Sequence, residues 1–135
     1  LRDLVERPAR VVLRQPESGA HILLRHLMER DGLPMDRLEV PEPPVLTEME
    51  VGFAVIEGKA DAGLAIRAVA NRLRLGFLPL HRERFDLVMR RRDYFGPEMQ
   101  ALLRFARTAA AERRAAELDG YDIGDLGRVR YNAPD

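Results

Sequence analysis

Residues 10–28 read RVVLRQPESGAHILLRHLM, which is typical of a short strand, a tight turn and a helix. Val11, Val12 and Leu13 form an apolar run of strand length. Pro16 has no N–H to donate to a sheet, and it therefore indicates a turn. Ser18 is a favourable N-cap, because its hydroxyl accepts from a backbone N–H one turn ahead. The helix after it has one apolar face at spacings of three and four residues, formed by Ala20, Leu23, Leu24, Leu27 and Met28.

The start of this predicted helix is a candidate ligand site. The first N–H groups of a helix have no partner within the helix and lie at the positive end of its dipole, so they bind anions readily. Gly19 has no side chain that would keep a ligand away from them. The alternative is that Ser18 and Gly19 only cap an ordinary helix. Taken alone, the pattern favours simple capping, because capped helices are common.

The rest of the sequence alternates predicted helices and strands. The predicted helices are residues 1–7, 47–57, 67–75, 97–106 and 109–118, and the predicted strands are residues 38–40, 59–66, 76–80 and 84–90. Thr47 and Glu50 match a capping box. The sequence PEPP at residues 41–44 predicts a loop within one domain. This alternation predicts an α/β fold, an open mixed sheet flanked by helices on both faces.

Composition sets limits on the class of protein. The chain has 135 residues, which suggests one domain, residues 1–135 acting as a single lobe. Its formal net charge is zero, so we expect no direct nucleic-acid binding and no attraction to an anionic membrane. It has no cysteine, which excludes disulfides and thiolate metal sites. No apolar run is long enough for a membrane span and no signal peptide is visible, so we expect a cytoplasmic protein.

Motifs for catalysis and metal binding are missing from the sequence. His21 and His26 are five residues apart and do not share a helical face, and His81 is isolated. Ser18 is not part of a G-x-S-x-G motif. The sequence contains no G-x-x-x-x-G-K-[ST] and no G-x-G-x-x-G. We therefore predict a protein that is not an enzyme and that binds no metal and no cofactor.

Several segments, taken in order, are similar to one family. They include RQPESGA, ADAGLAI, GFLPL and ERFDLV. Their order and spacing resemble the second lobe of type II periplasmic-binding-protein-like domains, in particular the molybdate-binding-like and LysR-type substrate-binding-like effector domains. Domains of this kind are found fused behind helix-turn-helix regulators or molybdopterin biosynthesis proteins. The similar segments are residues 14–20, 31–33, 54–58, 60–66, 76–80, 83–88 and 118–122.

The resemblance implies a ligand-binding lobe of an α/β fold. In this family two lobes close on a small molecule or an oxyanion and hold it with helix starts. By this resemblance the N–H groups at residues 18–20 would donate to the ligand, and residues 47–50 would form a second wall. The residues that the resemblance places at the ligand are Arg14, Gln15, Ser18, Gly19, Ala20, His21, Thr47, Glu50 and Gly63.

The sequence departs from the family pattern at the expected site. Glu17 replaces a glycine, His21 replaces an arginine, and Glu50 lies in a segment where the family often has a Thr-His or similar polar pair. Carboxylates at Glu17 and Glu50 would repel an oxyanion such as molybdate. The departures therefore leave open a neutral or cationic ligand, or a degenerate pocket.

Three functions follow from these observations. The preferred one is a non-catalytic sensor domain for a small ligand or oxyanion, serving as the effector domain of a transcriptional regulator. The second is an anion-binding or regulatory domain associated with a molybdopterin biosynthesis enzyme. The third is a structural or dimerisation module, and a homodimer is an expected assembly. Because the chain begins at Leu1 without an initiator methionine, we also expect a fragment whose first lobe or DNA-binding domain is missing.

Overall fold

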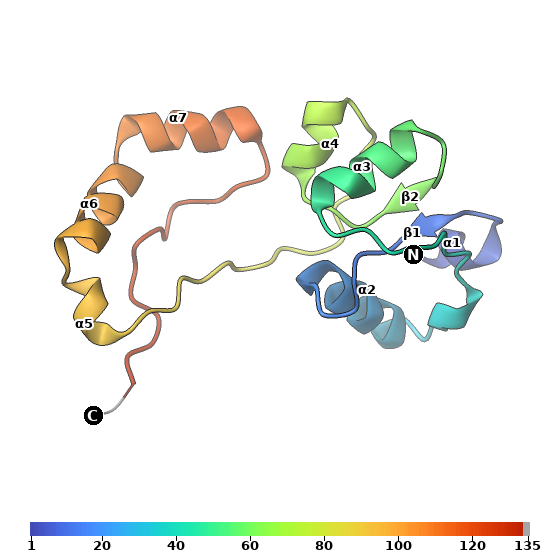
Figure 1. The fold of residues 1–135 in the computed structure, drawn as a ribbon, viewed down its shortest axis with the longest axis horizontal. Helices are drawn as coiled ribbons and strands as arrows, with labels where there is room; N and C mark the ends of the chain where they lie inside the picture. The colour runs from blue at the N-terminus through green and yellow to red at the C-terminus, as the bar shows by residue number, and fades with distance from the viewer. Residues whose placement is uncertain (134–135) are drawn as a thin grey trace. The chain divides into compact units, whose positions relative to one another are not determined.

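A computed structural model describes residues 1–133 and divides the chain into two compact units. The first unit is Leu1–Phe77, and the second begins at Leu78. Figure 1 shows the two units, which are described separately below. That residues 1–135 act as a single ligand-binding lobe stays a prediction.

The first unit is built on a small parallel sheet. β1 (Val11–Val12) pairs with β2 (Ala62–Gly63), so that Val11 lies opposite Ala62 and Val12 opposite Gly63. On the other side of β1, isolated parallel bridges join Arg10 to Glu39 and Arg14 to Val45. The chain from residue 39 to residue 45 therefore follows β1 without becoming a full strand.

Helices cover both faces of this sheet (Figure 1). The unit contains α1 (Arg2–Glu6), α2 (Gly19–Arg30), a 3-10 helix η1 (Met35–Arg37), α3 (Glu48–Ile56) and α4 (Arg67–Leu73). Adjacent strand residues point to opposite faces. Val11 packs with Leu24 and Met28 of α2, whereas Val12 packs with Val51 and Ala54 of α3. The predicted α/β architecture with helices on both faces is confirmed, on a smaller sheet.

The prediction of an open mixed sheet was wrong in its extent. The sheet in residues 1–133 has two strands, which are parallel. Residues 38–40 contribute only the bridge at Glu39, and residues 76–80 and 84–90 form no strand. The apolar residues of these two segments suggested strands, but no backbone–backbone hydrogen bond involves residues 76–89 in the described part of the chain. A strand requires hydrogen bonds to a neighbouring backbone, and within residues 1–133 these residues make none.

The second unit consists of helices that follow an extended segment. It contains α5 (Arg91–Tyr94), α6 (Pro97–Ala106) and α7 (Ala109–Leu118). The predicted helices at residues 97–106 and 109–118 are confirmed. The apolar face of α6 is only partly covered, since Leu103 is buried and Leu102 is 48% exposed. Phe85 and Val88 of the extended segment are 93% and 96% exposed.

An ion pair holds β1 and β2 in register. The backbone N–H of Arg10 donates to Asp61 Oδ2 at 2.8 Å. From the side chain of Arg10, Nη2 donates to Asp61 Oδ1 at 2.9 Å. Nη1 of the same guanidinium donates to the Gly58 carbonyl at 2.8 Å. These hydrogen bonds fix the segment that leads into β2 beside the start of β1. The hydrogen bonds from Arg10 to the Asp61 carboxylate also lower the pKa of that carboxyl from its usual 3.8 to about 2.

The first prediction concerns this ion pair. Because the pKa of Asp61 is lower in the folded chain, the pair stabilises the fold above pH 3.8 and its contribution is lost as the pH falls toward about 2. The difference in free energy of unfolding between the wild type and Asp61→Asn should therefore be large at neutral pH and shrink through this range. Urea titrations from pH 7 down to pH 2 measure it. Asp36→Asn, at an exposed position of η1, is the charge-matched control. If the difference in free energy of unfolding between the wild type and Asp61→Asn does not change with pH, the ion pair is not its source.

The second prediction concerns Gly63. A Cβ atom at this position would lie 2.4 Å from Val51 Cγ1 and 2.7 Å from Val12 Cγ1, which is closer than van der Waals contact allows. We expect Gly63→Ala to lower the free energy of unfolding by about 1–3 kcal/mol through overpacking. Gly76→Ala is the control, because no atom lies within 4 Å of its Cβ position. Equal stability of the two variants in urea would show that β2 has room for a side chain.

Candidate functional site

Three helix starts follow the carboxyl ends of the parallel segments in the first unit. β1 leads through residues 13–18 into α2, the bridge at Val45 leads into α3, and β2 leads through residues 64–66 into α4. Parallel segments end at the same edge of a sheet, so the loops before these helices start from that edge. In α/β sheets ligands bind outside the carboxyl ends of the strands. This edge is the candidate site.

The start of α2 has two backbone donors without an acceptor. Ser18 Oγ accepts from the His21 N–H at 3.2 Å, and the Ser18 N–H donates to the Gln15 carbonyl at 3.0 Å. The N–H groups of Gly19 and Ala20 have no acceptor within residues 1–133. No atom lies within 4 Å of the Cβ position of Gly19. The predicted cap is confirmed, and it leaves these two donors unpaired.

His21 is held against the end of β1. Its Nδ1 lies 3.0 Å from the carbonyl oxygen of Arg14. A carbonyl oxygen only accepts, so Nδ1 carries the hydrogen and Nε2 of the neutral ring is an acceptor. This hydrogen bond ties the ring of His21, the third residue of α2, to the loop that precedes the helix.

Arg14 connects the loop before α2 to the start of α3. Its Nη2 donates to the Leu46 carbonyl at 2.9 Å, and its Nη1 lies 3.6 Å from Glu48 Oε1. Nε of Arg14 and Oε1 of Gln15 are buried without a hydrogen-bond partner. The family resemblance implies that Arg14 and Gln15 lie beside the ligand. The structure places the guanidinium of Arg14 among acceptors of its own chain.

Glu48 lies in the segment expected as a second wall, residues 47–50, but it was not among the expected ligand residues. Its Oε2 accepts from the Ile66 N–H at 3.0 Å, and its Oε1 faces Arg14. The carboxylate thus joins the starts of α3 and α4 to the loop before α2. A signal was present in the sequence, because Glu48 occupies the first position of a helix, where an acidic side chain is favourable.

The carboxylate of Glu50 is directed at its own helix start. Glu50 Oε2 accepts from the N–H groups of Leu46 and Thr47 at 2.9 and 2.7 Å, and Thr47 Oγ1 accepts from the Glu50 N–H. The predicted capping box is therefore confirmed. The backbone hydrogen bonds from Thr47 and Leu46 lower the pKa of the Glu50 carboxyl. Glu17, the other carboxylate expected to repel an anion, is exposed.

The expected site residues fall into three groups. Six of them form the turn and first helical positions after β1, namely Arg14, Gln15, Ser18, Gly19, Ala20 and His21. Thr47 and Glu50 begin α3, which the Arg14–Leu46 hydrogen bond joins to that turn. Gly63 lies in β2, where its missing side chain makes room for Val12 and Val51. Gly63 therefore packs against the core residues Val12 and Val51.

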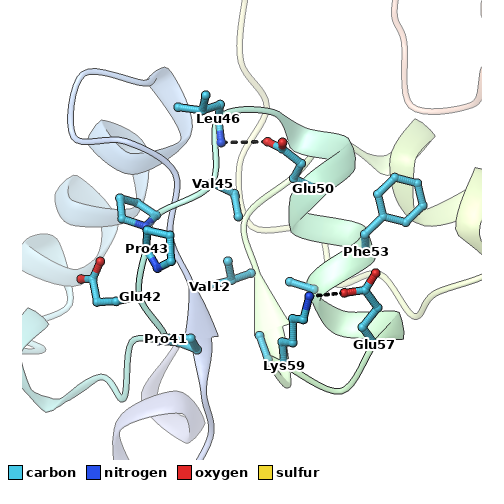
Figure 2. A pocket seen from close by; sticks show the side chains of 13 residues that line it. Val12, Pro41, Glu42, Pro43, Val45, Leu46, Glu50, Phe53, Glu57 and Lys59 are labelled. Carbon is cyan, nitrogen blue, oxygen red and sulfur yellow. Dashed lines mark hydrogen bonds and ion pairs between the residues drawn. The ribbon is translucent and has the colours of Figure 1, made fainter.

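A separate hollow lies on the α3 face of the sheet (Figure 2). It has a volume of about 710 Å³. Its walls are mainly apolar and come from the proline-rich segment, from α3 and from the sheet. Figure 2 shows the Glu57–Lys59 ion pair and the hydrogen bond from Leu46 to Glu50 at this hollow. Its lining residues are Val12, Pro41, Glu42, Pro43, Pro44, Val45, Leu46, Glu50, Phe53, Ala54, Glu57, Lys59 and Ala60.

This hollow and the start of α2 are different places. Of the expected site residues, only Glu50 lines the hollow. Its carboxylate is already engaged by backbone donors. The proline-rich segment, predicted as a loop, forms one wall of the hollow. No sequence pattern indicated a cavity there.

The described residues offer neither a metal-binding cluster nor a membrane-spanning helix. No group of three or more His, Cys, Asp or Glu side chains in residues 1–133 could hold a metal ion. Among the helices of the same residues, none has the length and apolar character needed to cross a bilayer.

The comparisons with known proteins point to a family. A family model described as a PBP (periplasmic-binding-protein) superfamily domain matches residues 1–107. A protein of Clostridium pasteurianum, described as an uncharacterized protein in the ferredoxin 2Fe-2S gene 5' region, is 24% identical over 84 residues. That match covers 62% of this chain and 74% of the relative. No solved structure matches the chain.

The third prediction concerns the cap of α2. Ser18→Ala removes the acceptor of the His21 N–H and should lower the free energy of unfolding by about 1 kcal/mol. Ser18→Asp supplies a carboxylate acceptor at the same position and should retain most of the stability. Urea denaturation followed by circular dichroism measures both variants. A Ser18→Asp chain as unstable as Ser18→Ala would show that the hydroxyl acts through some contact other than the cap.

Proposed function

Because the chain belongs to the PBP superfamily, we propose that it binds a small ligand at the start of α2 and that the group bound there is an oxyanion. The observation that carries this proposal is the pair of N–H groups at Gly19 and Ala20, which have no acceptor within the described residues. Donors of this kind, at the positive end of a 12-residue helix, suit the oxygens of an anion.

Simple capping accounts for only part of this geometry. Ser18 satisfies the N–H of His21, but the two donors before it stay unpaired. The open space at Gly19 allows an oxygen to approach them. Of the two carboxylates that were expected to repel an anion, Glu50 accepts from the N–H groups of Leu46 and Thr47, and Glu17 is exposed.

The biological role is part of the same proposal. The resemblance to molybdate-binding-like and LysR-type domains supports a non-catalytic sensor, the effector domain of a cytoplasmic transcriptional regulator. A ligand that binds one conformation of such a domain more tightly than another shifts the regulator toward that conformation.

The fourth prediction tests ligand binding. The chain is titrated with molybdate, sulfate, phosphate and nitrate while its free energy of unfolding is measured. An anion that binds only the folded chain should stabilise it by about 2.7 kcal/mol at a concentration of 100 times Kd. Titrations with sodium chloride at equal ionic strength control for screening. If every salt, sodium chloride included, raises the free energy of unfolding by the same amount, the proposal is refuted.

A pair of glycine variants identifies the place of binding. Gly19→Val should fold normally, because no atom lies within 4 Å of its Cβ position, but its side chain should obstruct the ligand and raise Kd at least about tenfold. Gly76→Val makes the same change at another open position of the first unit and should bind as the wild type does. Binding that is unaffected by Gly19→Val would place the ligand elsewhere.

A further inference from the structure

The hollow on the α3 face of the sheet reaches the hydrophobic core of the first unit. Val12, Ala54 and Ala60 line it, and each of them is at most 8% exposed. The same three residues pack with Val51 in one core cluster. Its volume of about 710 Å³ lies within the range of small-molecule sites, which is about 300–1,000 Å³. A small molecule in this hollow would therefore rest on core side chains.

The outer walls of the hollow are apolar and exposed. Phe53 of α3 is 45% exposed, and Leu46 is 64% exposed. Figure 2 shows the proline-rich segment on the side opposite α3. Its residues Pro41, Pro43 and Pro44 have no N–H group that could donate to an anion. This wall offers a ligand apolar surface, whose burial is favourable, and few hydrogen-bond donors.

The charged side chains at the hollow are mostly carboxylates. The lining contains Glu42, Glu50 and Glu57 against one ammonium group, that of Lys59. Lys59 is already paired with Glu57 (Figure 2), and Glu42 makes no ion pair within the described residues. The hollow therefore carries an excess of negative charge, and its ammonium group already has an anionic partner.

Glu50 has one carboxylate oxygen in reserve. Its Oε2 accepts from the N–H groups of Leu46 and Thr47 and from the Thr47 hydroxyl. Within residues 1–133 its Oε1 accepts no hydrogen bond. The backbone hydrogen bonds hold the pKa of this carboxyl below its usual value, so the group is charged at neutral pH.

We propose that the hollow is a second binding site and that its ligand is a small organic cation, an apolar body that carries one ammonium group. The apolar body packs against Phe53 and the proline wall, and the ammonium group pairs with Glu50. The face of an aromatic ring also attracts a cation, so Phe53 favours this class over a neutral apolar molecule. The site uses none of the N–H groups at the start of α2 and does not depend on the anion proposed there.

Three probes that share a phenyl ring separate the charge from the apolar body. Phenethylamine carries an ammonium group at neutral pH, phenethyl alcohol is neutral and hydrocinnamate is an anion. Each is titrated into the ¹⁵N-labelled chain at constant ionic strength, and the amide shifts give the Kd. We expect phenethylamine to bind at least about threefold more tightly than the alcohol, and hydrocinnamate to bind most weakly. The saturable shifts should occur at lining residues such as Phe53 and Lys59.

Glu50→Gln tests the role of the carboxylate. Glutamine also completes a capping box, because its amide oxygen can accept from the backbone N–H of Thr47, but it carries no charge. The preference for phenethylamine over the alcohol should fall below about twofold. Glu17→Gln removes the same charge from an exposed residue that does not line the hollow, and it should keep the preference.

Phe53→Ala tests the apolar wall. It should raise the Kd of phenethylamine at least about threefold, because the ligand loses an aromatic neighbour. Ile56→Ala is the matched control, since Ile56 belongs to the same helix, is 52% exposed and does not line the hollow. Its Kd should change less than about twofold.

The probe series on the wild-type chain decides the proposal even if a variant is unstable. Equal affinity for the three probes, or tightest binding of hydrocinnamate, would overturn the class of ligand. The absence of saturable shifts at the hollow with phenethylamine would overturn the site. Shifts of the same amides with protein concentration, without any probe, would show that a second copy covers the hollow and would also overturn it.

Discussion

The parallel alignment of β1 with its two neighbours is the constraint on which the candidate site depends. Val12 lies opposite Gly63 on one side, and Arg14 bridges to Val45 on the other. Since the three segments run in the same direction, the loops that lead into α2, α3 and α4 leave from one edge. The contacts of Arg14 and Glu48 then join these loops. The parallel direction of the segments brings these loops to one edge, and the side chains of Arg14 and Glu48 then connect them.

The first unit shows how much of such a site can be predicted from local sequence. The cap at Ser18 and the capping box of Thr47 and Glu50 are local hydrogen-bond patterns, and the structure confirms both. The contact between Glu48 and Ile66 joins residues 18 positions apart and depends on how α3 and α4 pack. No periodicity in the sequence encodes that contact, and the connecting role of Glu48 was therefore not predicted.

The predicted strand at residues 84–90 shows the opposite case, because a local pattern favoured a strand that the structure does not contain. Residues 84–90 are rich in apolar side chains and were predicted as a strand, yet Phe85 is almost fully exposed and its backbone is unpaired within residues 1–133. A strand is stabilised by its neighbours, and the pattern of one segment cannot supply them. Helices at residues 97–106 and 109–118 form where predicted because their backbone hydrogen bonds are local.

The central claim is that the N–H groups of Gly19 and Ala20 hold the ligand, and amide NMR tests it most directly. The chain, labelled with ¹⁵N, is titrated with the anion of the panel that stabilises it most. The account predicts that the largest saturable shifts occur at the amides of Gly19 and Ala20, with smaller ones at neighbouring loop residues. If these two amides stay unchanged while residues lining the hollow beside α3, such as Phe53 and Lys59, shift instead, the claim is contradicted.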